Sequence, residues 1–126
     1  MKKILITNNP LVYSQYRDNV NFMFSSDWSF LDVLKRTRNK IHDGHELLTH
    51  PLSGSIKPNE TPYKSIIISH DSKTLNMQSL QIIEESISTA EKFLKNRKPS
   101  SASLTDEILK DFQFVDFGLI KDSVER

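Results

Sequence analysis

Two short runs of consecutive apolar residues constrain the fold of this 126-residue chain more than any other feature. They are Ile4-Leu5-Ile6 and Ile66-Ile67-Ile68, and polar residues bound each run on both sides. A strand with one face in water alternates apolar and polar residues, whereas an unbroken apolar run is typical of a strand buried on both faces. Both runs therefore predict interior strands of a sheet that helices cover on its two sides, as in α/β proteins.

Two weaker patterns predict further strands between these runs. Val20, Phe22 and Phe24 alternate with two intervening positions, which predicts a strand with one better-buried face. Residues 47–49, a Leu-Leu-Thr segment, predict a brief third strand. The second isoleucine-rich run is then the fourth strand in chain order.

Capping signals place the first two helices. Asn9 followed by Pro10 predicts a helix start, because asparagine caps the first turn and proline suits the first helical position. Ser29 and Asp32 have the spacing of a capping box, which predicts the start of the second helix. Gly44 is placed to end that helix with a left-handed residue.

Apolar spacing predicts the last two helices. Residues 80–94 carry apolar side chains mostly three or four positions apart, which indicates an amphipathic helix that ends near Arg97. The final helix is expected to begin after Ser103 or Thr105. Its predicted buried stripe consists of Ile108, Phe112, Val115 and Leu119.

The order of these elements predicts one domain over residues 1–126, folded as a three-layer α/β sandwich. The sheet is expected to be small, four-stranded and mostly parallel, with strands in the spatial order 2-1-3-4 and two C-terminal helices. This is a Rossmann-like or flavodoxin-like topology. The fourth strand is the exception left open, because no crossover helix precedes it and it could run antiparallel.

A long proline-containing loop over residues 50–64 separates the last two predicted strands. Ligands of open α/β sheets bind beyond the carboxyl ends of the strands. In this chain, polar residues follow the carboxyl ends of the first and third predicted strands. This edge therefore predicts a pocket for a small anion or polar metabolite. The candidate ligand-binding residues carry hydroxyl, amide, imidazole or ammonium groups or a flexible backbone: Thr7, Asn8, Asn9, His50, Ser53, Gly54, Ser55, Lys57, Asn59, Thr61 and Lys64. The alternative is a surface loop whose polar side chains only stabilise its own turns.

Catalytic and metal chemistry have weaker support in the sequence. His50 and Glu60 are the candidate catalytic residues, but the Gly-x-Ser-x-Gly elbow of a serine hydrolase is missing. His42 and His45 do not share a predicted face with His50, so we expect no metal site. The chain has no cysteine and only three glycines, without either nucleotide-binding glycine motif, so we expect no thiol chemistry and no cofactor.

Charge and hydropathy indicate a cytoplasmic protein without nucleic-acid or membrane partners. Lys and Arg number 17 against 16 Asp and Glu, which leaves little excess charge for a phosphate backbone or an anionic membrane. The cations at Lys35, Arg36, Arg38 and Lys40 have no interleaved aromatic residue, so we interpret them as a solvated helix face. No apolar run approaches the roughly 20 residues that span a bilayer.

Two stretches, "KKILITNNPLV" and "GHELLTHPLSGSIKPNETPYKSIIIS", resemble the GrdX family, small proteins associated with glycine, sarcosine and betaine reductase systems of anaerobic bacteria. With "SLQIIEE", the resemblance spans residues 2–85. The family has no established activity, so the resemblance implies a setting and no catalytic role for any residue.

That setting is a bacterial cytosolic accessory protein beside a thiol-dependent reductase. Without cysteine the chain cannot relay electrons by thiol exchange. We therefore expect it to bind a reductase component or a small anionic ligand, and it could form a homodimer. The alternative is a small enzyme acting on a phosphorylated or carboxylated metabolite in the same crevice.

Overall fold

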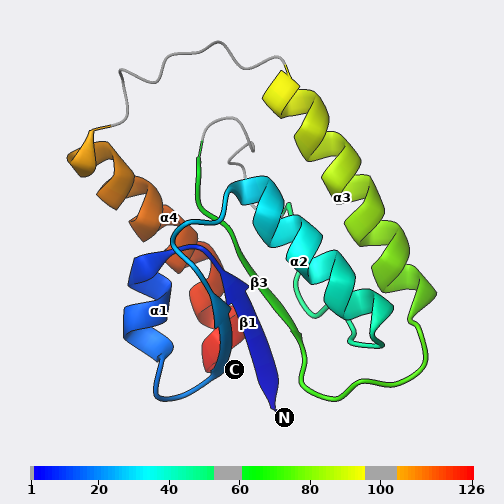
Figure 1. Cartoon of the computed structure of the whole chain (residues 1–126). Helices are drawn as coiled ribbons and strands as arrows, with labels where there is room; N and C mark the ends of the chain where they lie inside the picture. Colours follow the sequence, from blue (N-terminus) through cyan, green and yellow to red (C-terminus); the bar gives the residue numbers. More distant parts are fainter. Residues whose placement is uncertain (1, 53–60, 96–104) are drawn as a thin grey trace.

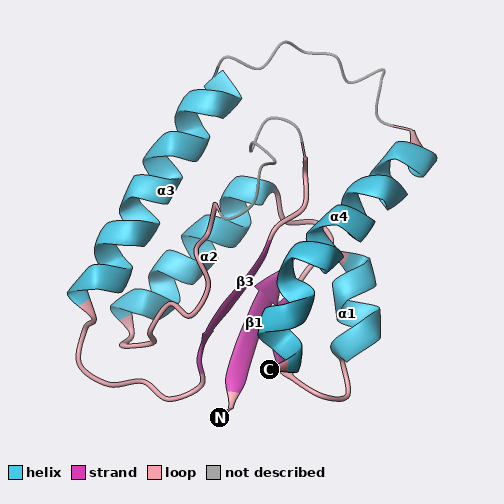
Figure 2. Ribbon diagram, turned by 180° about the vertical axis from the view of Figure 1, so that it is seen from behind, coloured by secondary structure: helices cyan, strands magenta, loops and turns pink. Residues whose placement is uncertain are grey.

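The computed structural model describes residues 2–52, 61–95 and 105–126 of the chain. Helices cover both sides of a small sheet, with α2 and α3 on one side and α1 and α4 on the other (Figures 1 and 2). The elements, in chain order, are β1 (Lys3–Thr7), α1 (Pro10–Tyr16), β2 (Asn21–Phe24), α2 (Phe30–His42), β3 (Ser65–Ser69), α3 (Met77–Lys95) and α4 (Asp106–Glu125).

The predicted four-stranded, mostly parallel sheet in the order 2-1-3-4 is wrong, and with it the Rossmann-like or flavodoxin-like topology. The described residues form a three-stranded sheet in the order β2-β1-β3. Strand β1 pairs with β2 in parallel, with Leu5 opposite Phe22. It pairs with β3 in the antiparallel direction, with Leu5 opposite Ile67. The sheet is therefore mixed, although the α/β class agrees with the sequence pattern.

The segment predicted as the third strand lies at the edge of this sheet and forms no strand of its own. Leu47 makes an isolated antiparallel bridge with Ile68, and the backbone N–H of Leu48 donates to the Ile67 carbonyl over 2.9 Å. The side chain of Leu48 is 39% exposed. A strand that is apolar throughout gains more from burial on both faces, so β3 takes the position beside β1. The segment before it runs back along the outer side of β3.

The two apolar runs form the centre of the molecule, as predicted. Ile66 and Ile68 are fully buried against residues of α2 and α3, whereas Ile67 packs with Leu5 on the opposite face. Alternate side chains of a strand point to opposite faces. One short strand therefore supplies both halves of the core.

The capping predictions for the first two helices are confirmed. The side chain of Asn9 caps α1 by accepting a hydrogen bond from the Leu11 N–H, and Pro10 is the first helical residue. Ser29 and Asp32 form the reciprocal capping box of α2. These local signals need no tertiary contact, because each satisfies backbone groups within its own first turn.

The predicted buried stripe of the last helix is largely wrong. Ile108, Val115 and Leu119 remain 38%, 42% and 42% exposed, respectively. Helix α4 instead buries Asp116 and Ile120. Asp116 accepts hydrogen bonds from Asn9, which precedes α1, and from Ser65 of β3, and this polar anchor sets which face of α4 turns inward.

Candidate functional site

Asn8 joins the end of β1 to the segment that enters β3. Its side-chain amide donates to the carbonyl oxygens of Pro62 over 2.8 Å and of Trp28 over 3.0 Å. Its side-chain oxygen accepts the backbone N–H of Lys64 over 2.9 Å. The polar residues after β1 and the end of the long loop therefore lie at the same edge of the sheet, which we call the rim.

Asn9 joins the rim to α4. Its side-chain nitrogen donates to the Gln113 carbonyl and to Asp116 Oδ2, each over 3.0 Å. Asn9 itself is fully buried. Because its side-chain oxygen caps α1 and its side-chain nitrogen holds α4, the residue positions two helices around the rim.

A directed chain of hydrogen bonds ends on the buried carboxylate of Asp116. Ser65 Oγ donates to Asp116 Oδ2 over 2.7 Å. Thr7 Oγ1 and Ser65 Oγ lie 2.7 Å apart, and because the Ser65 hydrogen is committed to Asp116, the Thr7 hydroxyl is the donor. The Thr7 oxygen in turn accepts the backbone N–H of Asn9 over 2.9 Å. Each polar group in the chain has a partner.

Burial raises the pKa of Asp116 above its ordinary value, whereas the hydrogen bonds from Asn9 and Ser65 and the charge of Lys64 act in the opposite direction. Burial also lowers the pKa of Lys64, and the charge of Asp116 opposes that effect. The buried carboxylate and the buried amine therefore act on each other through their charges without a direct ion pair, and each favours the charged form of the other.

Lys64 lines, together with Asp116, a narrow crevice of about 10 Å³, which has room for about one water molecule. Its side chain is 5% exposed, and no described residue makes a hydrogen bond or direct ion pair with its ammonium. Every fully enclosed polar side-chain atom of the described residues has a partner. The Lys64 ammonium has none among these residues, so it is not fully enclosed, and we infer that it opens onto the crevice that Lys64 lines. The crevice walls are Phe30, Leu52, Thr61, Tyr63, Lys64, Val115, Asp116 and Leu119.

A cleft of about 370 Å³ adjoins this crevice, and the two spaces share Phe30, Thr61 and Tyr63. This volume falls at the lower end of the range of small-molecule sites. The guanidinium of Arg36 lies 4.9 Å from the centre of the Trp28 ring and adds positive charge beside the cleft. The full lining is Asn8, Ser26, Trp28, Ser29, Phe30, Leu31, Thr61, Pro62, Tyr63, Leu94 and Leu109.

The structure distributes the predicted ligand-binding residues unevenly. Thr61 and Lys64 line the crevice, and Asn8 lines the cleft, whereas Thr7 and Asn9 lie buried beneath the rim. Ligand binding by these residues remains a prediction. The candidates outside the described residues are Ser53, Gly54, Ser55, Lys57, Asn59 and the catalytic candidate Glu60.

The catalytic candidate His50 lines neither space at the rim. It is exposed, and its Nδ1 atom accepts the backbone N–H of Leu52 over 3.1 Å, as a residue that stabilises its own turn does. The described residues contain no group of three side chains able to hold a metal ion. His45 lies near the other end of the sheet, with its Nδ1 atom 2.8 Å from the Ser69 carbonyl.

Three residues that shape the rim were missed in the sequence. Trp28 and Tyr63 belong to no sequence motif that predicts a binding site. Asp116 had a usable signal, because a carboxylate four positions from Phe112 and from Ile120 falls on an apolar helix face. A charged residue at such a position is rarely buried without partners.

A larger hollow of about 450 Å³ lies at the opposite end of the sheet. It contains Glu46, Asp71 and Lys73, all of which are exposed. Exposed side chains satisfy their charges with water, so they show no preference for a ligand. The buried ammonium of Lys64 is what distinguishes the rim from this hollow.

Lys64→Met is expected to remove one pH-dependent contribution to stability. The folded protein holds the pKa of Lys64 below its ordinary value of 10.5, so between these two pKa values the unfolded chain binds more protons. The free energy of unfolding therefore rises with pH through this window in the wild type and loses this rise in the variant. Urea denaturation from about pH 7 to about pH 10.5 measures the difference. Identical pH profiles would contradict the assignment, and Lys35→Met is the exposed control.

The fold and the rim define a class of protein: a small α/β domain with a mixed sheet and a charged, partly buried site at the carboxyl end of its central strand. No described helix has the length and apolar character needed to cross a membrane.

The chain belongs to the GrdX family. It matches the family model described as GrdX-like protein over residues 4–125, which extends the resemblance to nearly the whole chain. Comparison with curated proteins and with solved structures finds no match.

Proposed function

We propose that this GrdX-like protein is a non-redox accessory protein of a glycine, sarcosine or betaine reductase system, which binds a small carboxylate or phosphate ligand at the rim. The observation that carries the ligand proposal is the buried ammonium of Lys64, which opens onto a crevice and has no direct partner among the described residues. Family membership supports the setting. The absence of cysteine argues against a thiol-exchange role.

The two adjoining spaces suit different parts of such a ligand. The crevice holds about 10 Å³, so one oxygen atom of an anionic group would enter it and meet the Lys64 ammonium. A charge-assisted hydrogen bond to a desolvated cation is stronger than one in water. The body of the ligand would occupy the cleft, where Trp28 and Tyr63 offer apolar surface and Ser26 offers a hydroxyl group. Asp116 lines the same crevice, so a bound anion must place its charge nearer to Lys64 than to this carboxylate.

A ligand panel tests this proposal directly. Acetate, glycine and inorganic phosphate serve as probes in thermal denaturation, because a ligand that binds only the folded state raises the unfolding midpoint. We expect at least one probe to do so, and we expect Lys64→Met to weaken its binding by about tenfold or more, since about 1.5–3 kcal/mol is typical of a hydrogen bond to a charged group.

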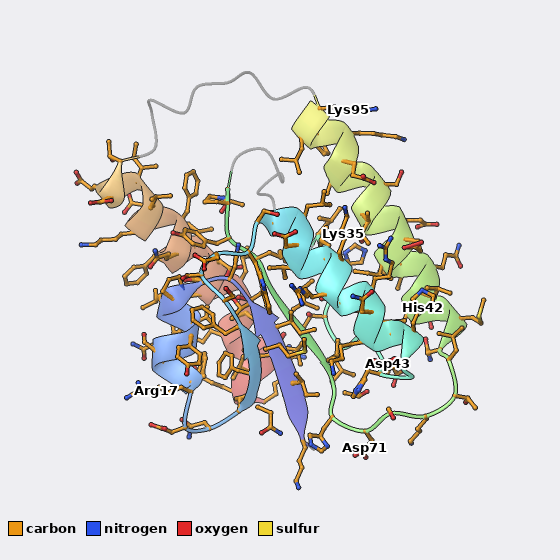
Figure 3. The ribbon with its side chains drawn as sticks, viewed as in Figure 1. Arg17, Lys35, His42, Asp43, Asp71 and Lys95 are labelled. Carbon is orange, nitrogen blue, oxygen red and sulfur yellow. The ribbon has the colours of Figure 1, made fainter. Side chains whose placement is uncertain are left out.

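Lys35→Met is the matched control, because Lys35 is an exposed cation of α2 (Figure 3) and lines neither space at the rim. The control is expected to bind the probe as the wild type does. Equal loss in both variants would point to general electrostatic attraction and contradict a site at Lys64.

The reductase partner requires a separate experiment. Tagged protein recovered from cells growing on glycine is expected to carry a reductase component with it. A recovery without any reductase component, together with no response to any probe, would overturn the proposed function.

A further inference from the structure

The outward face of α4 carries Phe114, the most exposed large apolar side chain of the described residues. Phe114 is 68% exposed, whereas the adjacent Val115 lines the crevice at the rim. Figure 2 shows α4 in front of the sheet, with no other described helix or strand over its outer side. Aromatic side chains are enriched at protein–protein interfaces relative to the rest of the surface, so an aromatic ring left this exposed suits a site of association.

Gly118 lies one helical turn after Phe114 on the same side of α4. A Cβ atom at this position would meet nothing within 4 Å, so no described contact within the chain requires glycine there. Glycine in a helix interior is less favourable than alanine. A close approach from outside the chain would explain its presence, because glycine leaves a notch in the helix surface.

Four residues of α4 are placed symmetrically in the sequence about residue 116. Phe114 and Gly118 stand two positions before and after residue 116, and Asp111 and Lys121 stand five positions before and after it. Asp111 and Lys121 are both exposed, and neither pairs with a described residue. Two antiparallel copies of α4 that cross at this level would bring each aspartate to the level of the other copy's lysine.

We propose that this face of α4 binds a second copy of the chain in an antiparallel, two-fold symmetric pair. Each Phe114 ring then lies against Gly118 of the second copy, and each Asp111 carboxylate lies within reach of Lys121 of the second copy. A two-fold axis makes every contact occur twice, so one complementary pair of positions serves both copies. The charges select the antiparallel arrangement, because a parallel one would place like charges at the same level.

Sedimentation equilibrium from about 1 µM to about 1 mM, a range that covers weak association, tests the pair. We expect a concentration-dependent dimer in the wild type. Asp111→Lys and Lys121→Asp should each weaken it by about tenfold or more, while the double variant Asp111→Lys/Lys121→Asp should restore it by exchanging the two charges. These positions are exposed, and circular dichroism verifies that each variant folds.

Gly118→Ala separates the dimer from the fold because its two expected effects have opposite signs. Alanine should raise the thermal midpoint of the monomer, since it favours the helix and meets no described atom. It should also weaken the dimer, since its methyl group fills the notch for Phe114. A wild type that stays monomeric throughout, or a charge exchange that fails to restore association, would overturn the proposal.

Discussion

Gly44→Ala is expected to lower the free energy of unfolding by about 3–5 kcal/mol, which places it among the most damaging single substitutions in the chain. Gly44 has a φ of +104°, a conformation that L-residues with a side chain rarely adopt. A Cβ atom there would also lie 2.9 Å from the backbone nitrogen of Lys73 and closer still to its carbonyl oxygen. Backbone atoms cannot turn aside, so the loop before α3 would have to move.

The position matters because Gly44 ends α2 and starts the return toward β3. The Gly44 N–H donates to the Ile41 carbonyl over 3.0 Å, and the His45 N–H donates to the Lys40 carbonyl over 3.1 Å. This is the Schellman arrangement, which satisfies carbonyl groups at the end of a helix. The Gly44 carbonyl also accepts the Lys73 N–H over 3.0 Å, which ties the end of α2 to the chain before α3.

Urea denaturation of the two glycine variants measures this effect. Gly118→Ala is the matched control, and at low protein concentration it should gain about 0.5–1 kcal/mol, because its helical position accepts a side chain. Similar stability changes of the two variants would show that neither the positive φ nor the approach of Lys73 constrains Gly44.

Asp116→Ala is expected to cost about 3–5 kcal/mol, because it removes the carboxylate that compensates the buried charge of Lys64 and leaves the rest of the network unsatisfied. The Ser65 hydroxyl and the Asn9 amide would each lose an acceptor in a buried site. The ammonium of Lys64 would lose the carboxylate that favours its charged form. Each of these losses carries the desolvation cost of a buried polar group.

A double-mutant cycle with Lys64→Met isolates the charge contribution. Asp116→Ala should cost less in the Lys64→Met background than in the wild type, because no buried cation is then left uncompensated. Asp116→Asn, which keeps an acceptor for Ser65 and Asn9, should lie between the wild type and Asp116→Ala. An equal cost of Asp116→Ala in both backgrounds would show that the carboxylate does not compensate Lys64.

Several features of this protein follow from neighbouring residues alone. Asn9 and Pro10 start α1, and Ser29 and Asp32 start α2, because each pair satisfies backbone groups within one helical turn. The central isoleucines are buried because no stable arrangement leaves such a run in water. The loop after residue 50 was also predicted to meet the end of β1, and its described end does so through Asn8.

The strand order and the face of α4 required the folded molecule. Leu47-Leu48 and the isoleucines of β3 are both apolar enough for a strand, and only their competition for the place beside β1 settles which one lies inside. Asp116 counts against burial on any hydropathy scale, yet it is buried because Asn9 and Ser65 supply donors from positions far along the chain.

Local hydrogen bonds and apolar runs thus predict the helices and strands of the described residues, but they also predict a strand over residues 47–49 that the fold reduces to an isolated bridge. The charged rim exists only where β1, β3 and α4 converge, because a buried charge is tolerated only when distant residues surround it with partners.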